Sequence, residues 1–253
     1  GGDCAALMAV TFLKRMGFHP KGTVTLSYMS DEENGGWLGA KYLTQNGYLD
    51  ADVGICMEPT RGMILNNHYG ILRLKFTYRA APHHAGSPHQ STDALEKAVA
   101  AIVKLYELDR ELTKRVDAYG NHPSCLSITV LHAGNTPNVQ PGLAEFIVDR
   151  RLDLSETVEF GLAQILKIFD ELKEKDPEYE YEYELLSDRP CLTIEDDNPF
   201  IQTAMKSYEQ IMGKPAKLYV RSGGSDAATI RCAHGTVIPN WGTASDSGEF
   251  GSG

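Results

Sequence analysis

Three acidic residues, Asp31, Glu32 and Glu33, stand together in the stretch SDEENGG, directly after an apolar run that is typical of a β-strand. Adjacent residues of a regular strand point to opposite faces, so these carboxylates converge on one site only if the chain turns there. Gly35 and Gly36 permit a turn, because glycine adopts backbone conformations that other residues avoid. Taken alone, the run also fits a solvated acidic turn, which is the usual role of a charge run.

Another carboxylate, Glu58, ends the next apolar run, DVGICMEPT, and Pro59 then turns the chain away from a sheet. Parallel strands end together at one edge of their sheet, where open α/β proteins bind ligands. Carboxylates gathered at that edge repel one another unless a proton or a cation lies between them. By itself Glu58 equally fits an exposed side chain before a proline turn. Together the acids favour a divalent cation site, and zinc would also need histidine.

A parallel sheet is needed to bring these acids together, and both ends of the chain carry its pattern of apolar strands alternating with helices. The expected helices are residues 4–16 (apolar almost all round and therefore buried), 36–47, 198–213 and 225–235, and the expected strands are 22–30, 51–57, 216–224 and 236–242.

The middle of the chain has a different pattern, in which strands and helices follow one another as β-α-β-β-α-β. That order is typical of the ferredoxin-like split unit. We therefore predict an α/β protein with two domains. Residues 1–68 and 188–253 would form a discontinuous catalytic domain with a partial parallel sheet, and residues 69–187 an inserted antiparallel domain.

The overall composition disfavours several classes of protein. The 253 residues carry a net charge of −10, so the basic face of a nucleic-acid-binding protein is missing. No apolar run approaches the ~18 residues that a membrane span needs. The five cysteines are odd in number and far apart, which favours buried reduced thiols and a cytoplasmic protein.

Five motifs occur in one order along the chain: DEENGGWLGAKYL, EPT, APHHAGSPHQSTDALEKA, NTPNVQPGLAEFIVDRRLD and GGSDAA. Each is weak evidence alone, but their order and their spacing around the inserted domain are specific. The chain resembles the zinc-dependent amidohydrolase family of acetylornithine deacetylase, succinyl-diaminopimelate desuccinylase, aminoacylase and glutamate carboxypeptidase. The resemblance implies two zinc ions per active site, with cobalt or manganese as alternatives, and a homodimer formed through the inserted lid domain.

The resemblance assigns the acids separate roles. Glu32 matches the general base, Glu33 matches a metal ligand, and Glu58 matches the carboxylate ligand of the second metal. This division suits the chemistry, because a metal-bound water needs a nearby carboxylate to accept its proton.

A histidine of the lid domain is also implied. His84 matches the family's lid histidine, which reaches the active site of the partner subunit and stabilises the oxyanion, a task that needs a donor where negative charge develops. His83 and His89 lie close by, so the choice among the three histidines stays open.

Substrate-binding residues follow in the same way. Asn138 and Arg151 match positions that contact the carboxylate end of the substrate, and arginine is suited to a bidentate grip on a carboxylate. Arg150 should face solvent from the opposite side of the same strand. Gly224 and Ser225 match a substrate-binding turn at a helix start. Asp226 reads as the N-cap of that helix rather than as a catalytic residue.

The chain departs from the family pattern at three metal ligands: a histidine on an early strand, a bridging aspartate and a final histidine. Asp3 is a poor substitute for the bridging aspartate, and His234 does not fit the final slot. We therefore expect this chain, which looks shortened at both ends, to bind zinc weakly and to hydrolyse little by itself. The expected function is hydrolysis of an amide bond in an N-acyl amino acid or small peptide. The alternative is a non-catalytic, dimerising interaction module.

Overall fold

The computed structural model describes residues 1–87, 92–117 and 124–243. The chain divides into two compact units. Unit 1 comprises Gly1–His68 and Leu192–Gly253, and unit 2 comprises Tyr69–Cys191. The chain returns to unit 1 slightly later than the boundary at 187/188 that the sequence suggests, because the last strand of unit 2 continues to Arg189. Among the described residues, no helix is both long enough and apolar enough to cross a bilayer.

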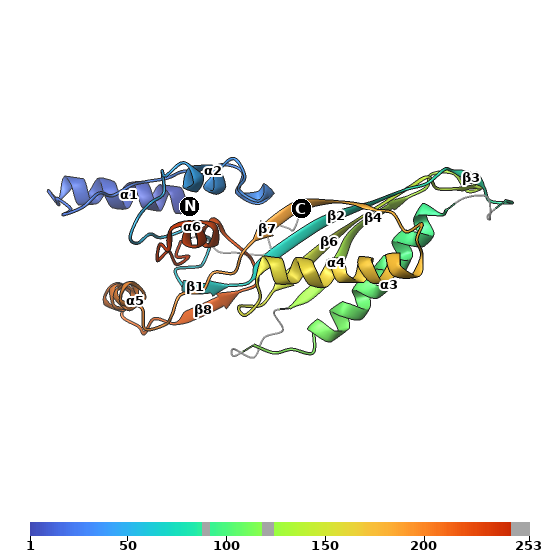
Figure 1. Ribbon diagram of the computed structural model, residues 1–253. Coiled ribbons are helices and arrows are strands. Elements are labelled where there is room, and N and C mark those ends of the chain that lie inside the picture. Colours follow the sequence, from blue (N-terminus) through green and yellow to red (C-terminus); the bar gives the residue numbers. More distant parts are fainter. Residues whose placement is uncertain (88–91, 118–123, 244–253) are drawn as a thin grey trace. The chain divides into compact units, whose positions relative to one another are not determined.

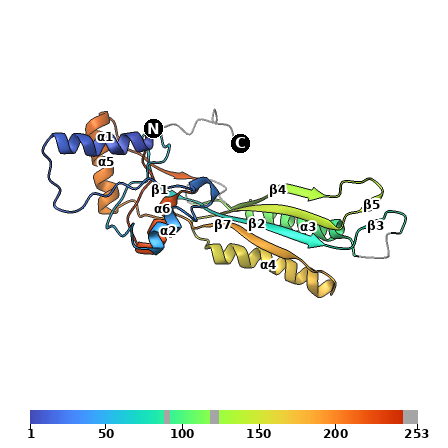
Figure 2. The same cartoon turned by 90° about the horizontal axis from the view of Figure 1, so that it is seen from above.

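Unit 2 is built on one four-stranded antiparallel sheet with the strand order β4-β6-β2-β7. Helices α3 and α4 pack against each other and cover one face of this sheet (Figure 1). The bounds are β2 Gly70–Arg79, α3 Ala94–Leu112, β4 Cys125–Ala133, β6 Leu143–Leu152, α4 Val158–Lys175 and β7 Glu182–Arg189. This is the β-α-β-β-α-β order that the sequence predicts. Two short strands, β3 His83–His84 and β5 Val139–Gln140, pair beyond the ends of β2 and β6 (Figure 2).

Alternation along the strands explains the core of unit 2. Every second side chain of β2 and β6 faces the helices and is buried, and these residues form one apolar cluster with the inner faces of α3 and α4. Phe76 of β2 lies at the centre of the cluster. It stacks on Phe169 of α4 with ring centroids 4.1 Å apart and on Phe146 of β6 at 5.3 Å.

Unit 1 contains a two-stranded parallel sheet, β1 with β8, and helices that pack around it. Its elements are α1 Gly2–Arg15, the short 3-10 helix η1 Glu32–Asn34, α2 Ala40–Gln45, β1 Ile64–His68, α5 Pro199–Met212, β8 Leu218–Arg221 and α6 Asp226–His234. Its apolar core is formed mainly by α6, the start of α5 and the segment from Leu192 to Ile194.

Three predicted strands of unit 1 are wrong as regular strands. Residues 22–30 form no strand, and segments 51–57 and 236–242 meet only in isolated parallel bridges, at Val53 with Val237 and at Cys56 with Asn240. Strand β1 was not predicted. Apolar and β-branched residues prefer extended backbone, but a strand forms only where another chain segment pairs with it, and composition cannot supply that partner.

Two predictions of burial in unit 1 are also wrong. Helix α1 ends as expected, with Lys14 and Arg15 in its last turn and Gly17 at φ 74°, but none of its residues is buried. Cys4 and Cys232 are exposed rather than buried. An apolar composition indicates that a helix should pack against other apolar residues, but it does not show that such residues are present.

Candidate active site

The acidic stretch forms a tight turn, as its two glycines permit. Asp31 has a left-handed backbone at φ 64°, η1 follows, and Gly35 and Gly36 have φ values of 97° and 69°. The turn is closed by the Gly36 N–H, which donates to the Asp31 carbonyl oxygen at 2.8 Å. Asp31 also supports the turn with its side chain, because its Oδ2 accepts from the Leu38 N–H at 3.1 Å. Glu32 therefore stands on a backbone held from both sides.

Gly36 brings the turn against helix α6. A Cβ atom at this position would lie 2.8 Å from Oδ1 of Asp226, so a larger residue would push the two segments apart. Asp226 is buried and is the first residue of α6, while Ser225 holds the N-cap position. The prediction that Asp226 is the N-cap is therefore wrong by one residue, and its carboxylate points toward the acidic turn instead.

A cavity of about 300 Å³ gathers carboxylates from several segments of unit 1, among them Asp3 of α1 and Asp50. Glu32 from η1, Glu58 from the end of segment 51–57 and Asp226 from α6 are among the residues that line it. Glu33 is exposed in the same turn as Glu32 and is not among the lining residues. The structure thus brings Glu32 and Glu58 to one site and adds Asp226, which the sequence did not indicate as part of the site.

The negative charges of these acids affect the pKa of the Cys56 thiol, which also lines the cavity. Desolvation raises the pKa of Cys56 above its usual range, and the charges of Glu58, Asp226 and Glu32 raise it further. One cation lies opposite them, because Nη1 of Arg221 is 3.5 Å from Oε2 of Glu58. Arg221 directly precedes the Gly-rich turn after β8, a position that could have been noticed from the sequence. Burial and the neighbouring acids therefore both disfavour the thiolate form of Cys56.

The Gly-rich turn places Gly224 and Ser225 between β8 and α6. Ser225 is buried, and its backbone N–H donates to Nε2 of His68 at 3.3 Å. Its hydroxyl donates to Oδ1 of Asn240 at 2.7 Å. His68 and Asn240 lie outside every motif noted in the sequence, and no sequence signal marks them.

The structure places the lid candidates in unit 2 and brings two of them together. His84 pairs with Val139 across β3 and β5, and the Ala85 N–H donates to the Asn138 carbonyl oxygen at 2.9 Å. His84 and Asn138 are both exposed. His84 Nδ1 accepts from the Gly86 N–H at 3.0 Å, which leaves Nε2 as the outward nitrogen of the ring. His89 lies outside the described residues.

The two arginines of the DRRLD motif have different surroundings. Arg151 donates through Nε to Oδ1 of Asp149 at 2.7 Å and keeps part of its side chain exposed. Arg150 is fully buried, and its Nη2 donates to both carboxylate oxygens of Glu156, at 2.9 and 3.0 Å. The prediction that Arg150 faces solvent is wrong, because Glu156 supplies the partner that a buried guanidinium requires.

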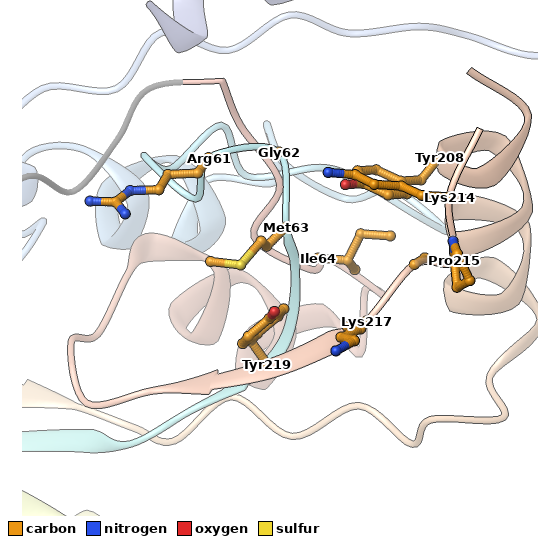
Figure 3. Close-up of a pocket in the computed structure, with 10 residues that line it drawn as sticks. Arg61, Gly62, Met63, Ile64, Tyr208, Lys214, Pro215, Lys217 and Tyr219 are labelled. Atoms are coloured by element: carbon orange, nitrogen blue, oxygen red, sulfur yellow. The ribbon is translucent and has the colours of Figure 1, made fainter. Parts of the chain in front are cut away.

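A second cavity, of about 340 Å³, lies between the start of β1, the end of α5 and the start of β8. Figure 3 shows Tyr208, Lys214, Met63 and Ile64 among the residues that line it. No carboxylate is among its lining residues, and none of them lines the first cavity. Hydrolytic chemistry therefore has its candidate residues in the carboxylate-lined cavity.

The donor set of that cavity does not complete a zinc site. Asp3, Glu32, Asp50, Glu58 and Asp226 offer carboxylate oxygens, the pKa of the Cys56 thiol is raised, and no histidine is among the lining residues. Protein zinc sites usually include imidazole or thiolate ligands. Across residues 1–87, 92–117 and 124–243, no group of three or more His, Cys, Asp or Glu side chains is placed to hold a metal ion. The residues described here supply at most part of a metal centre.

Comparison with known proteins places the chain in a family. A family model described as "Peptidase family M20/M25/M40" matches residues 1–249. The chain belongs to this family. The resemblance drawn from the five motifs is thereby confirmed, and metallohydrolases of this family generally use divalent metals, commonly zinc.

Individual relatives are distant and longer. An uncharacterized metallohydrolase of Methanocaldococcus jannaschii and carboxypeptidase G2 of a Pseudomonas species are each 26% identical to the chain. These matches cover 97% and 99% of the chain but only 64% and 60% of the relatives' own length. The structure of aminopeptidase PepT from Bacillus cereus matches with a TM-score of 0.70 at 22% identity, covering 95% of this chain and 61% of that one. The mixed α/β fold is thus shared with this aminopeptidase, and the chain spans about 60% of the length of the relatives it matches.

Proposed function

We propose that the protein to which this chain belongs hydrolyses an amide bond in an N-acyl amino acid or a small peptide. The observation that carries the proposal is the shared cavity of Glu32 and Glu58 in a chain of the M20 family. Carboxylates that lie close together repel one another. Their gathering from segments far apart in sequence therefore suggests a function that compensates for this cost. In a hydrolase, one of them accepts and returns protons, and the others hold charge in place.

Glu32 is the proposed general base. It is half-buried, it lines the cavity, and its turn is closed by hydrogen bonds on both sides. In this role it accepts a proton from the attacking water and delivers a proton to the leaving amine. Glu58, which lines the cavity with Arg221 beside it, is one proposed metal ligand. Glu33, exposed in the turn of Glu32 and outside the cavity lining, is the other, a role that rests on the family pattern alone.

The substrate and the dimer belong to the same proposal. His84 of β3 and Asn138, which directly precedes β5, are close together and exposed, so their polar groups can contact a ligand. We assign the oxyanion to His84, the carboxylate end of the substrate to Asn138 and Arg151, and a further substrate contact to the turn that contains Gly224 and Ser225. Unit 2 is the proposed lid domain, through which two copies form a homodimer.

The test is an assay of the complete protein with added zinc against N-acetyl and N-succinyl amino acids and dipeptides. Glu32→Gln should keep the volume of the side chain and lower kcat by about 10²–10⁴, the usual contribution of a general base, with little change in KM. Glu195→Gln is a matched control, because Glu195 is exposed in unit 1 and does not line the cavity.

Zinc content and circular dichroism should be the same in both variants and the unmutated protein. Full activity of the Glu32→Gln variant would remove the proposed base. If the complete protein hydrolyses none of the substrates, the non-catalytic interaction module is the better description.

A further inference from the structure

Three polar side chains meet in the interior of unit 1: His68 at the end of β1, Ser225 before α6, and Asn240. Their exposed fractions are 0%, 2% and 2%. Burying polar groups costs free energy unless each finds a hydrogen-bond partner, so a group of three in contact needs a reason.

The hydrogen-bond geometry indicates that Nε2 of His68 acts as an acceptor. The Ser225 N–H donates to His68 Nε2 at 3.3 Å, and the Ser225 hydroxyl donates to Asn240 Oδ1 at 2.7 Å. The hydroxyl oxygen also lies 3.2 Å from His68 Nε2. Because the Ser225 N–H needs a lone pair on Nε2, the ring proton of neutral His68 must be on Nδ1.

Ser225 does not act as an ordinary helix cap. A serine at the N-cap position normally accepts a hydrogen bond from an N–H in the first turn. Ser225 makes no such bond, because its hydroxyl is turned toward Asn240 instead. Nor is it placed as a nucleophile, since the hydroxyl is buried and its proton is directed away from the histidine. The remaining role is to fix the turn that contains it.

Both partners of Ser225 are anchored by their own backbones. The His68 N–H donates to the Leu192 carbonyl at 3.1 Å, and the Leu192 N–H donates back at 3.0 Å. Asn240 exchanges two 2.9 Å hydrogen bonds with Leu65 of β1. Strand β1 therefore sets the position of Ser225 from two sides.

We propose that His68 is a positioning residue for the turn Gly223–Ser225. Its Nε2 takes the Ser225 N–H, which holds Gly224 in place for the substrate and holds Asp226, the next residue, against the cavity of Glu32. The inference rests on the proposed function, because that function assigns Gly224 to the substrate.

The experiment compares His68→Gln with His68→Met in the complete protein. Both replacements are unbranched and similar in length, but only glutamine offers an oxygen that accepts the Ser225 N–H well. Hydrogen exchange of the Ser225 amide should become about tenfold faster in His68→Met, which corresponds to about 1.4 kcal/mol, the order of one hydrogen bond. In His68→Gln it should stay near that of the unmutated protein.

Steady-state kinetics supply a readout that mere loss of stability would not move. His68→Met should raise KM more than it lowers kcat, and His68→Gln should restore KM. Equal exchange and equal KM in the two variants would overturn the inference. If the protein hydrolyses nothing, the exchange comparison still decides the positioning role, while the proposed function fails separately.

A third measurement covers the case in which His68→Met does not fold. Imidazole ¹⁵N signals of the unmutated protein should show His68 with its proton on Nδ1. A proton on Nε2 would contradict the bond from Ser225 and overturn the inference.

Discussion

Unit 2 and unit 1 differ in how completely their apolar residues are covered. In unit 2, one sheet face and two helices enclose a continuous cluster that includes three stacked phenylalanine rings. In unit 1, the core is small, helix α1 has no buried residue, and Leu7, Phe12 and Phe18 are exposed. The candidate base Glu32 stands in the unit with the smaller core.

The difference is related to where each strand finds the strand that pairs with it. Every strand of the unit 2 sheet pairs antiparallel with strands of the same segment, so burial follows from local alternation. In unit 1, β1 and β8 lie on opposite sides of the whole segment that forms unit 2, so their sheet joins two separate parts of the chain. The sheet of unit 1 therefore has a pairing partner only when these two parts of the chain come together.

The largest expected effect tests the core of unit 2. Phe169→Ala should lower the free energy of unfolding by about 3–5 kcal/mol, because it removes a ring that is fully buried and stacked on Phe76. Phe160→Ala is the matched control on the same helix, with a ring that is 48% exposed, and it should cost less than about 1 kcal/mol. Urea unfolding followed by circular dichroism measures both values. Similar costs for the two substitutions would mean that α4 does not pack as described.

An alkaline transition is the next expected effect. Burial raises the pKa of Tyr179 to about 12 and raises the pKa of Tyr78 as well. The two hydroxyls lie 2.8 Å apart, and Tyr179 donates to the Lys97 carbonyl oxygen. Because the folded state favours the protonated phenols, their stabilising contribution is complete below about pH 10 and is lost as the pH rises toward about 12.

The measurement is the free energy of unfolding at several pH values between about 8 and 11, in the unmutated chain and in Tyr179→Phe. The variant should be less stable at neutral pH, because it loses a buried hydrogen bond, but its stability should fall less steeply as the pH rises. If the free energy of unfolding fell equally steeply with pH in both proteins, unit 2 would open before Tyr179 ionises. The contrast between a well-covered core in unit 2 and a small core in unit 1 would then be weaker.

The fold of unit 2 could be predicted from sequence because its signals are local. Alternating residues in β2 and β6 and the helical stripes of α3 and α4 each report burial against a neighbour in the same segment. The strands expected at 22–30, 51–57 and 236–242 could not be decided this way, since extended propensity does not identify a pairing partner. Strand β1, with its polar centre Asn66 and Asn67, gave no apolar signal although both side chains are buried.

The candidate site follows the same division. Glu32 and Glu58 could be recognised because each follows an apolar run and belongs to a motif with a fixed neighbourhood. Asp226 could be seen as a helix-start residue but not as a wall of the cavity, because its approach depends on Gly36 of another segment. His68 and Asn240 act through hydrogen bonds to a residue far away in sequence, so no local pattern could reveal them.

The smallest expected effect tests the exposed side of unit 1. Phe12 of α1 is 52% exposed, close to the exposure of Phe160 in unit 2. Phe12→Ala in the chain of 253 residues should therefore change the free energy of unfolding by about 0.5 kcal/mol or less, as most surface substitutions do. Tryptophan fluorescence follows this change, because Trp37 and Trp241 both belong to unit 1. A cost approaching that of Phe169→Ala would mean that α1 is covered in solution, and the contrast between the two units would then be one of composition and not of burial.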